Sequence, residues 1–132
     1  TDINSAWEEL KQRVSNCSKC ELCKSRINTV LGEGDINSRV VLIGEAPGED
    51  EDKQGRPFVG RAGQLLTNIL EKGGNIPRSS VYITNTIKCR PPDNRNPNLN
   101  EVTCCREYLE AQLLLLQPKI IVTLGNIPTK AY

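Results

Sequence analysis

The residues of this 132-residue chain that most directly suggest chemistry are its six cysteines. Three are spaced three apart near the N-terminus and the others follow much later: Cys17, Cys20, Cys23, Cys89, Cys104 and Cys105. Thiolates separated by two residues in a turn can bind one metal ion or one edge of an iron–sulfur cluster. Because the chain contains no His, a metal site here would be ligated by thiolates alone. A four-thiolate site would tie the N-terminal segment to the later part of the chain.

Helical phase favours one of the two adjacent cysteines. The capping-box pattern Asn98-Leu-Asn-Glu101 predicts a helix that runs to about Leu116. Cys105 lies three residues after Val102 and four before Leu109, on the apolar face of that helix, whereas Cys104 is about 100° away. We therefore expect four ligands, with Cys23 and Cys104 as alternates: Cys17, Cys20, Cys89 and Cys105.

Two other interpretations of the cysteines remain. They can be buried small hydrophobic residues, although six in 132 residues, three of them in a CxxCxxC row, argue against this. Zinc ribbons usually use two CxxC pairs, whereas this chain has one compact group and scattered partners. The pattern thus favours an iron–sulfur cluster, with zinc as the alternative.

Composition excludes several classes of protein. Without His, this chain cannot carry a Ser/His/Asp or Cys/His nucleophilic site or an HExxH metal site. Its net charge of +1 gives no overall basic signal, so a nucleic-acid site would be a local patch. No apolar run approaches the roughly 20 residues that span a bilayer, and no secretory segment opens the chain. We expect a cytoplasmic protein without membrane association.

Strand and helix patterns alternate along the chain. Short β-branched runs predict strands at 39–43, 81–86 and 119–124, and apolar periodicity predicts helices at 5–15, 61–72 and 98–116. This order predicts a single α/β domain over residues 1–132, a three-layer α/β/α sandwich with a central parallel sheet. Residues 45–60 are predicted to form a polar loop. In such sheets ligands bind at the carboxyl ends of the strands.

The segments after the first two strands contain the remaining candidates, each with an ordinary alternative. Gly44 to Ala46 can bring backbone close to a phosphate or base, or can be a plain turn. Phe58, flanked by Arg56 and Arg61, can stack on a base or anchor its loop in the core. Asn85 can read a base edge or stabilise a turn. The acidic run Glu49–Asp52 can hold Mg²⁺, although a solvated charge run is the better interpretation.

A local basic stretch follows the second strand: Lys88, Arg90, Arg95 and Arg106, with Asn94 and Asn96 between. Its residue types fit contacts to phosphates, and they fit an ordinary surface equally well.

Together these pieces resemble one family, the family 4 (iron–sulfur) uracil-DNA glycosylases. The resemblance runs from about Cys17 to Gly125 and rests on these motifs: Cys17-x-x-Cys20-x-Leu22, Arg26, Gly32-Glu-Gly34, Gly44-Glu-Ala-Pro-Gly-Glu-Asp-Glu-Asp52, Gly55-Arg-Pro-Phe-Val-Gly-Arg-Ala-Gly63, Tyr82-Ile-Thr-Asn85-x-x-Lys-Cys-Arg-Pro-Pro92, Asn94-Arg95-x-Pro97 and Cys105. It implies four parallel strands, of which about three lie in this chain. It also implies a [4Fe-4S] cluster on Cys17, Cys20, Cys89 and Cys105, and removal of uracil from DNA.

The resemblance also implies roles for the residues at the strand ends. Phe58 would stack on a flipped uracil, Asn85 would read its edge, and backbone from Gly44 to Ala46 would line the pocket. Glu45 would position water or stabilise a cationic sugar in the transition state. Single- or double-stranded uracil-containing DNA would be the partner of a monomer, contacted by Arg56, Arg61, Lys88, Arg90, Asn94 and Arg95.

In the family, a His from a C-terminal His-Pro-Ser-type motif stabilises the departing base. This chain has no such motif and no Met, so we expect a C-terminally truncated fragment that lacks the last strand and is inactive or impaired. Two other functions compete: an iron–sulfur electron-transfer or structural module without DNA chemistry, and a metal-dependent phosphohydrolase that uses Glu49–Asp52.

Overall fold

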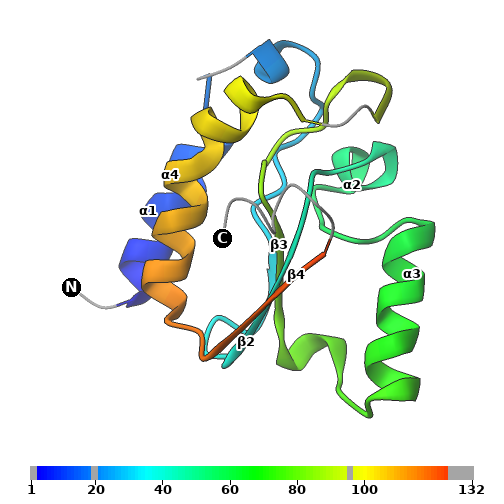
Figure 1. The fold of residues 1–132 in the computed structure, drawn as a ribbon. Helices are drawn as coiled ribbons and strands as arrows, with labels where there is room; N and C mark the ends of the chain where they lie inside the picture. Colours follow the sequence, from blue (N-terminus) through cyan, green and yellow to red (C-terminus); the bar gives the residue numbers. More distant parts are fainter. Residues whose placement is uncertain (1–2, 19–20, 95–96, 125–132) are drawn as a thin grey trace.

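The computed structural model describes residues 3–18, 21–94 and 97–124, and these form three layers (Figure 1). Helices α1 (Ile3–Ser15) and α4 (Leu99–Leu116) cover one face of the central sheet, and α2 (Glu49–Gln54) and α3 (Arg61–Asn68) lie on the other side. The predicted α/β/α sandwich is therefore confirmed.

Three parallel strands form the centre of the sheet, as predicted: β2 (Val40–Gly44), β3 (Tyr82–Asn85) and β4 (Ile120–Thr123). The strand order is β1-β3-β2-β4, and β1 (Glu33–Gly34) pairs with β3 antiparallel. The prediction of three strands missed β1, because two residues carry no periodic pattern. Gly34 has a φ of 126°, and a side chain there would collide with the Val81 carbonyl, so glycine permits this pairing.

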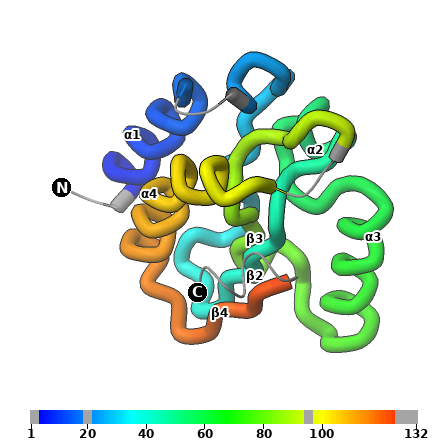
Figure 2. Tube along the Cα trace, turned by 45° about the horizontal axis from the view of Figure 1, so that its top comes forward, coloured from blue at the N-terminus to red at the C-terminus, as the bar shows by residue number. Residues whose placement is uncertain are grey.

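The larger core cluster lies between the sheet and the helix pair α1 and α4, which lie next to each other in Figure 2. Trp7, Leu10 and Val14 form the buried face of α1, as their spacing predicts. The Trp7 ring meets Tyr82 of β3 edge-on, with 5.4 Å between ring centroids. On the opposite face of the sheet, Leu42, Val81 and Ile83 form a second cluster against which Phe58, Leu66 and Leu70 pack.

The bounds of α4 follow the prediction closely. Asn98 Oδ1 accepts a hydrogen bond from the Glu101 amide at 2.9 Å, and Glu101 Oε1 accepts one from the Asn98 amide at 3.0 Å. This is the predicted capping box. The prediction for α1 was less accurate, because the helix already includes Ile3 and so does not begin at Ser5.

On the other face of the sheet, the 61–72 helix is confirmed with a change of helix type, and the 45–60 loop prediction was wrong in part. The α-helical part ends at Asn68, and a wider π turn covers Ile69–Gly73. The segment predicted as a 45–60 loop contains α2. Its acidic residues occupy the first helical turn, where the helix dipole favours negative charge, and Gly55 ends the helix with a φ of 71°.

Among the described residues, every helix is too short or too polar to span a lipid bilayer.

Candidate active site and cysteine-rich end

Gly44, the last residue of β2, lies at the centre of the candidate site. Gly44 lies opposite Asn85 in the parallel register of β2 and β3. A methyl group at Gly44 would lie 2.5 Å from Asn85 Oδ1 and would also collide with the Phe58 ring. The structure therefore brings together three predicted site residues that are far apart in sequence. Phe58 also packs on the cluster of Leu42, Val81 and Ile83, so the two sequence interpretations of this ring are compatible.

Backbone hydrogen bonds join the ends of β2 and β3. The Thr86 amide donates to the Gly44 carbonyl at 2.9 Å, and the Ile87 amide donates to the Glu45 carbonyl at 3.1 Å. Glu45 and Ala46 are half-buried beside this connection. The wall that these residues form is thus fixed by the segment that follows Asn85.

Lys88 corrects one sequence prediction. Its side chain is fully buried and donates to the Asn85 carbonyl at 2.6 Å and to Thr84 Oγ1 at 2.7 Å. Burial lowers the pKa of Lys88 to about 7, although the nearby Cys105 thiol acts in the opposite direction. Lys88 therefore holds the end of β3 in place and does not reach the surface, where a phosphate would bind.

The acidic run divides into two halves: Glu49 and Asp50 are exposed, as a solvated charge run predicts, whereas Glu51 and Asp52 bind backbone. The Glu51 carboxylate accepts hydrogen bonds from the amides of Gly48, Val59 and Gly60 at 2.8–2.9 Å. Asp52 is buried and accepts from the amides of Ile27 and Asn28. These two carboxylates organise backbone segments on either side of α2. They are neither a solvated charge run nor a pair left open for Mg²⁺.

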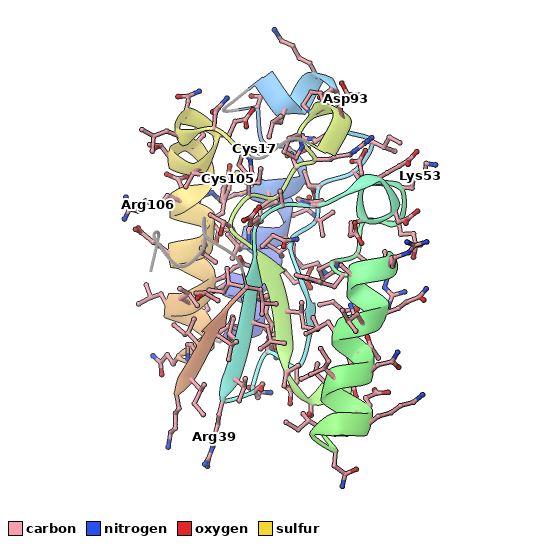
Figure 3. All side chains as sticks on the ribbon, turned by 45° about the vertical axis from the view of Figure 1, so that its right-hand side comes forward. Cys17, Arg39, Lys53, Asp93, Cys105 and Arg106 are labelled. Atoms are coloured by element: carbon pink, nitrogen blue, oxygen red, sulfur yellow. The ribbon has the colours of Figure 1, made fainter. Side chains whose placement is uncertain are left out.

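Cysteines from three segments gather at one end of the molecule, where Figure 3 shows Cys17 and Cys105. Buried Cys89 and Cys105 pack together with Leu22 and Ile87, a group that we call the cysteine core. Cys105 thus lies on the buried face that helical phase predicts.

Arg26 and Tyr108 are polar side chains that interact with the thiols at this end of the molecule. Arg26 donates to Cys89 Sγ at 3.1 Å. Burial opposes its charge, but this bond and the nearby thiols of Cys17 and Cys23 raise its pKa overall. Burial, together with a hydrogen bond to Cys17, raises the pKa of Tyr108.

These surroundings fit a thiolate-ligated group. Thiols are the ligands that iron–sulfur clusters and zinc prefer, and the Arg26 guanidinium offsets negative charge on them. Cys20 lies outside the described residues, and no group of three metal-ligating side chains among those described is assembled closely enough to hold a metal ion. Cys23 and Cys104 are half-buried.

Comparison with known proteins decides the family. Residues 31–132 match the Uracil DNA glycosylase superfamily. The chain belongs to this superfamily. It is 51% identical to the type-4 uracil-DNA glycosylase of Thermotoga maritima over 118 residues, which cover 89% of this chain and 61% of that protein. It is 50% identical to the type-4 uracil-DNA glycosylase of Sulfurisphaera tokodaii, covering 93% of this chain and 56% of that protein.

A more distant relative is the type-5 uracil-DNA glycosylase of Thermus thermophilus, which is 35% identical over 116 residues, 77% of this chain and 52% of that protein. The resemblance seen in the sequence motifs is therefore confirmed. The chain spans about three-fifths of the length of the type-4 relatives that it matches.

The predicted DNA-contacting residues of this superfamily member lie in different surroundings. Arg61 is exposed at the first position of α3, and Arg90 is half-buried. Arg56 is exposed but donates through Nε to Glu33 Oε1 at 2.6 Å, so part of its guanidinium is already used in an ion pair. Arg95 and the side chain of Asn94 lie outside the described part of the chain.

Glu33 gives the first testable prediction. The hydrogen bond from Arg56 lowers the pKa of Glu33 below its ordinary value of 4.5, although partial burial raises it. A carboxyl whose pKa falls on folding stabilises the fold above its unfolded pKa, and this contribution disappears as pH falls through the folded pKa. We expect Glu33→Gln to lower the Tm of the full-length protein by roughly 2–4 °C at pH 7. This difference should shrink as pH falls below about 4.5.

Thermal unfolding of both proteins between pH 7 and pH 3 measures this effect. The matched control is Glu110→Gln, which removes an exposed pair with Arg106 on α4 and should leave the Tm nearly unchanged throughout. A Tm difference for Glu33→Gln that stays constant with pH would contradict the linkage.

Proposed function

We propose that this protein is a uracil-DNA glycosylase, which hydrolyses the N-glycosidic bond of uracil in DNA. The observation that carries the proposal is the convergence of Phe58 and Asn85 on Gly44 at the carboxyl ends of β2 and β3. A flat base that forms hydrogen bonds needs an aromatic ring to stack on and an amide to bind its edge. Phe58 and Asn85 offer these groups beside Gly44, which has no side chain to obstruct them. The names of the type-4 relatives support the same activity.

Base recognition assigns the two side chains. A stacked base hides its glycosidic bond, so the nucleotide must first be flipped out of the duplex. Phe58 stacks on the flipped uracil, while the Asn85 amide donates to O4 and accepts from N3–H. Cytosine presents an amino donor and an N3 acceptor at these positions, so the same amide disfavours it.

Catalysis then depends on groups beside the sugar and the departing base. Backbone from Gly44 to Ala46 lines the pocket, and Glu45 either positions the attacking water or stabilises positive charge that develops on the sugar. Uracil leaves as an anion, so hydrogen bonds that strengthen as this charge develops lower the barrier. The backbone of Glu45 is held beside the pocket by the hydrogen bond that its carbonyl accepts from the Ile87 amide, which supports its assignment to the water or the sugar.

The cysteines hold a [4Fe-4S] cluster with a structural role, and zinc is the less favoured alternative. Its ligands are Cys17, Cys20, Cys89 and Cys105. The chemistry that the cluster supplies when bound is a covalent connection between the N-terminal segment, the loop after β3 and α4. The thiol-rich surroundings of Arg26 support this assignment.

The net charge of the chain is only +1, so the attraction to DNA comes from basic side chains placed where the DNA binds. Arg56, Arg61, Arg90, Arg95 and Asn94 contact the sugar–phosphate backbone of single- or double-stranded DNA, and affinity falls as salt rises. Lys88 is not in this set because it is buried. The protein acts as a monomer in the cytoplasm, and the 132 residues alone release uracil weakly or not at all.

One assay tests the proposal. Full-length protein is incubated with uracil-containing single- and double-stranded DNA in EDTA, and abasic sites are counted. We expect EDTA-resistant release of uracil. Activity only with added Mg²⁺ would point to the phosphohydrolase instead, and no release by cluster-loaded protein would refute the glycosylase and leave an iron–sulfur module.

The close approach at Gly44 gives a sharper prediction. Gly44→Ala places a methyl group against Asn85 and Phe58, which must shift, so uracil release should fall by roughly 100-fold or more. Gly73→Ala is the matched control, since no atom lies within 4 Å of the added methyl group. Single-turnover excision by both variants measures the effect. Equal rates for the two would show that the pocket lies elsewhere.

The cluster assignment predicts a difference between two adjacent cysteines. Cys105→Ser removes a buried member of the cysteine core, whereas Cys104→Ser changes a half-buried neighbour. We expect the first variant to lose its iron and its visible absorbance, which bleaches on reduction, and the second to keep both. Bound zinc without visible absorbance would contradict the iron–sulfur assignment, and equal loss in both variants would contradict the choice of Cys105.

A further inference from the structure

Arg78 makes contacts that neither the sequence motifs nor the proposed chemistry explain. It lies in the short 3-10 helix η3 (Arg78–Ser80) before β3, and its side chain is only 17% exposed. Its guanidinium donates to the Pro57 carbonyl at 2.5 Å, to the Phe58 carbonyl at 2.6 Å and to Thr67 Oγ1 at 2.9 Å. Arg78 thus binds the backbone that carries Phe58.

The backbone at Phe58 needs such support. Its φ is 51°, a left-handed conformation that is strained for a residue with a large side chain. The Phe58 carbonyl also lies so close to Gly63 that any side chain at Gly63 would collide with it. A turn in this conformation persists only where its surroundings hold it there.

Packing alone does not hold this turn. A cavity of about 460 Å³ lies beside it, and its lining includes Phe58, Val59, Thr67 and Arg78. The turn is therefore not enclosed by packed side chains on the side of this cavity. The forces that oppose movement of the turn are directional hydrogen bonds.

Two charged groups supply those bonds from opposite sides of the turn. Arg78 donates to the carbonyls of residues 57 and 58, and the Glu51 carboxylate accepts from the amides of residues 59 and 60. Glu33, 3.3 Å from the guanidinium, offsets its charge. Charge-assisted bonds of this kind are about twice as strong as neutral ones.

This placement of the Arg78 guanidinium leaves one of its nitrogens without a hydrogen bond to a described residue. Arg78 Nε is buried and has no hydrogen-bond partner among the described residues. A buried donor left unpaired costs free energy, so the orientation of this side chain is not the one that would satisfy all of its own nitrogens. It is the orientation that directs the outer two nitrogens at the Phe58 backbone.

We propose that Arg78 is a positioning residue that fixes the Phe58 ring against Gly44 and thereby sets how tightly the flipped base binds. The proposal rests on the base-binding role of Phe58 given above. Lysine can replace Arg78 only in part, because a single ammonium lacks the planar fork that reaches two carbonyls and a hydroxyl together. Arg78 does not touch the base and acts through Phe58 alone.

A double-mutant cycle tests this in the full-length, cluster-loaded protein. We expect Arg78→Ala to lower kcat/KM for uracil-containing DNA by roughly 10- to 100-fold, the range expected for loss of one base–aromatic stack. Arg78→Lys should fall between this variant and wild type. Phe58→Ala combined with Arg78→Ala should be no slower than Phe58→Ala alone. Multiplicative losses in the double variant would overturn the proposal.

A second measurement separates positioning from general damage to the fold. The inhibition constant of free uracil should rise in Arg78→Ala, whereas inhibition by DNA that contains an abasic site, which offers no base to stack, should stay unchanged. Equal weakening of both ligands would overturn the proposal in favour of a structural role. The control is Arg39→Ala, an exposed arginine at the end of the molecule opposite Cys17 (Figure 3), which should match wild type.

Hydrogen exchange gives a readout that needs no activity. Amides of residues 58–63 should exchange faster in Arg78→Ala and Arg78→Lys than in wild type, while those of α4 stay protected. Unchanged exchange in this segment would overturn the proposal. If wild-type protein released no uracil, the proposed function would fail, and faster exchange would still establish that Arg78 holds the Phe58 turn.

Discussion

The close approach of Phe58 and Asn85 to the backbone at Gly44 is the constraint on which the rest of the site depends. A methyl group at Gly44 would lie 2.5 Å from Asn85 Oδ1, so the end of β2 has space for hydrogen only. The parallel register places Asn85 there directly, because residues opposite each other in β2 and β3 are brought together by the sheet. Phe58 is not placed by strand register, although its side chain packs on Leu42 and Ile83 of the sheet. Its position depends on the turn after α2, and that turn depends on polar contacts.

Those contacts show a consistent use of charge. Glu51, Asp52 and Arg78 direct their charged groups mainly at backbone amides and carbonyls. Exposed ion pairs contribute little to stability, whereas a charged group bonded to backbone at a half-buried position fixes the path of the chain. The Glu51–Asp52 half of the acidic run therefore acts as a connector. It joins α2 to the 27–28 segment on one side and to the Phe58 turn on the other.

The sequence predicted the elements that have a long apolar pattern. The face of α1, the capping box of α4 and the three parallel strands are visible as spacing alone. The helix α2 was missed because its six residues have no apolar face and its stability comes from caps and from Asp52 contacts about 25 residues away. Lys88 was predicted at the surface because a basic stretch does not indicate which of its cations is buried. Its contacts with Thr84 and the Asn85 carbonyl are formed only in the folded structure. No sequence pattern indicates that the backbone at Phe58 is left-handed or that Arg78 binds the carbonyls of this turn.

Lys88 also explains how the cysteine-rich end and the candidate pocket are connected. Ala46 packs against the cysteine core, so the two regions share a wall. Between them, Lys88 bonds the Asn85 carbonyl and lies near Cys105. A displacement of the segment that contains Cys89 would therefore move the carbonyl of Asn85 as well. Under the proposed function, a group bound by the cysteines would act on recognition by holding Asn85 in register with Gly44, and this requires no electron transfer and no part in bond cleavage.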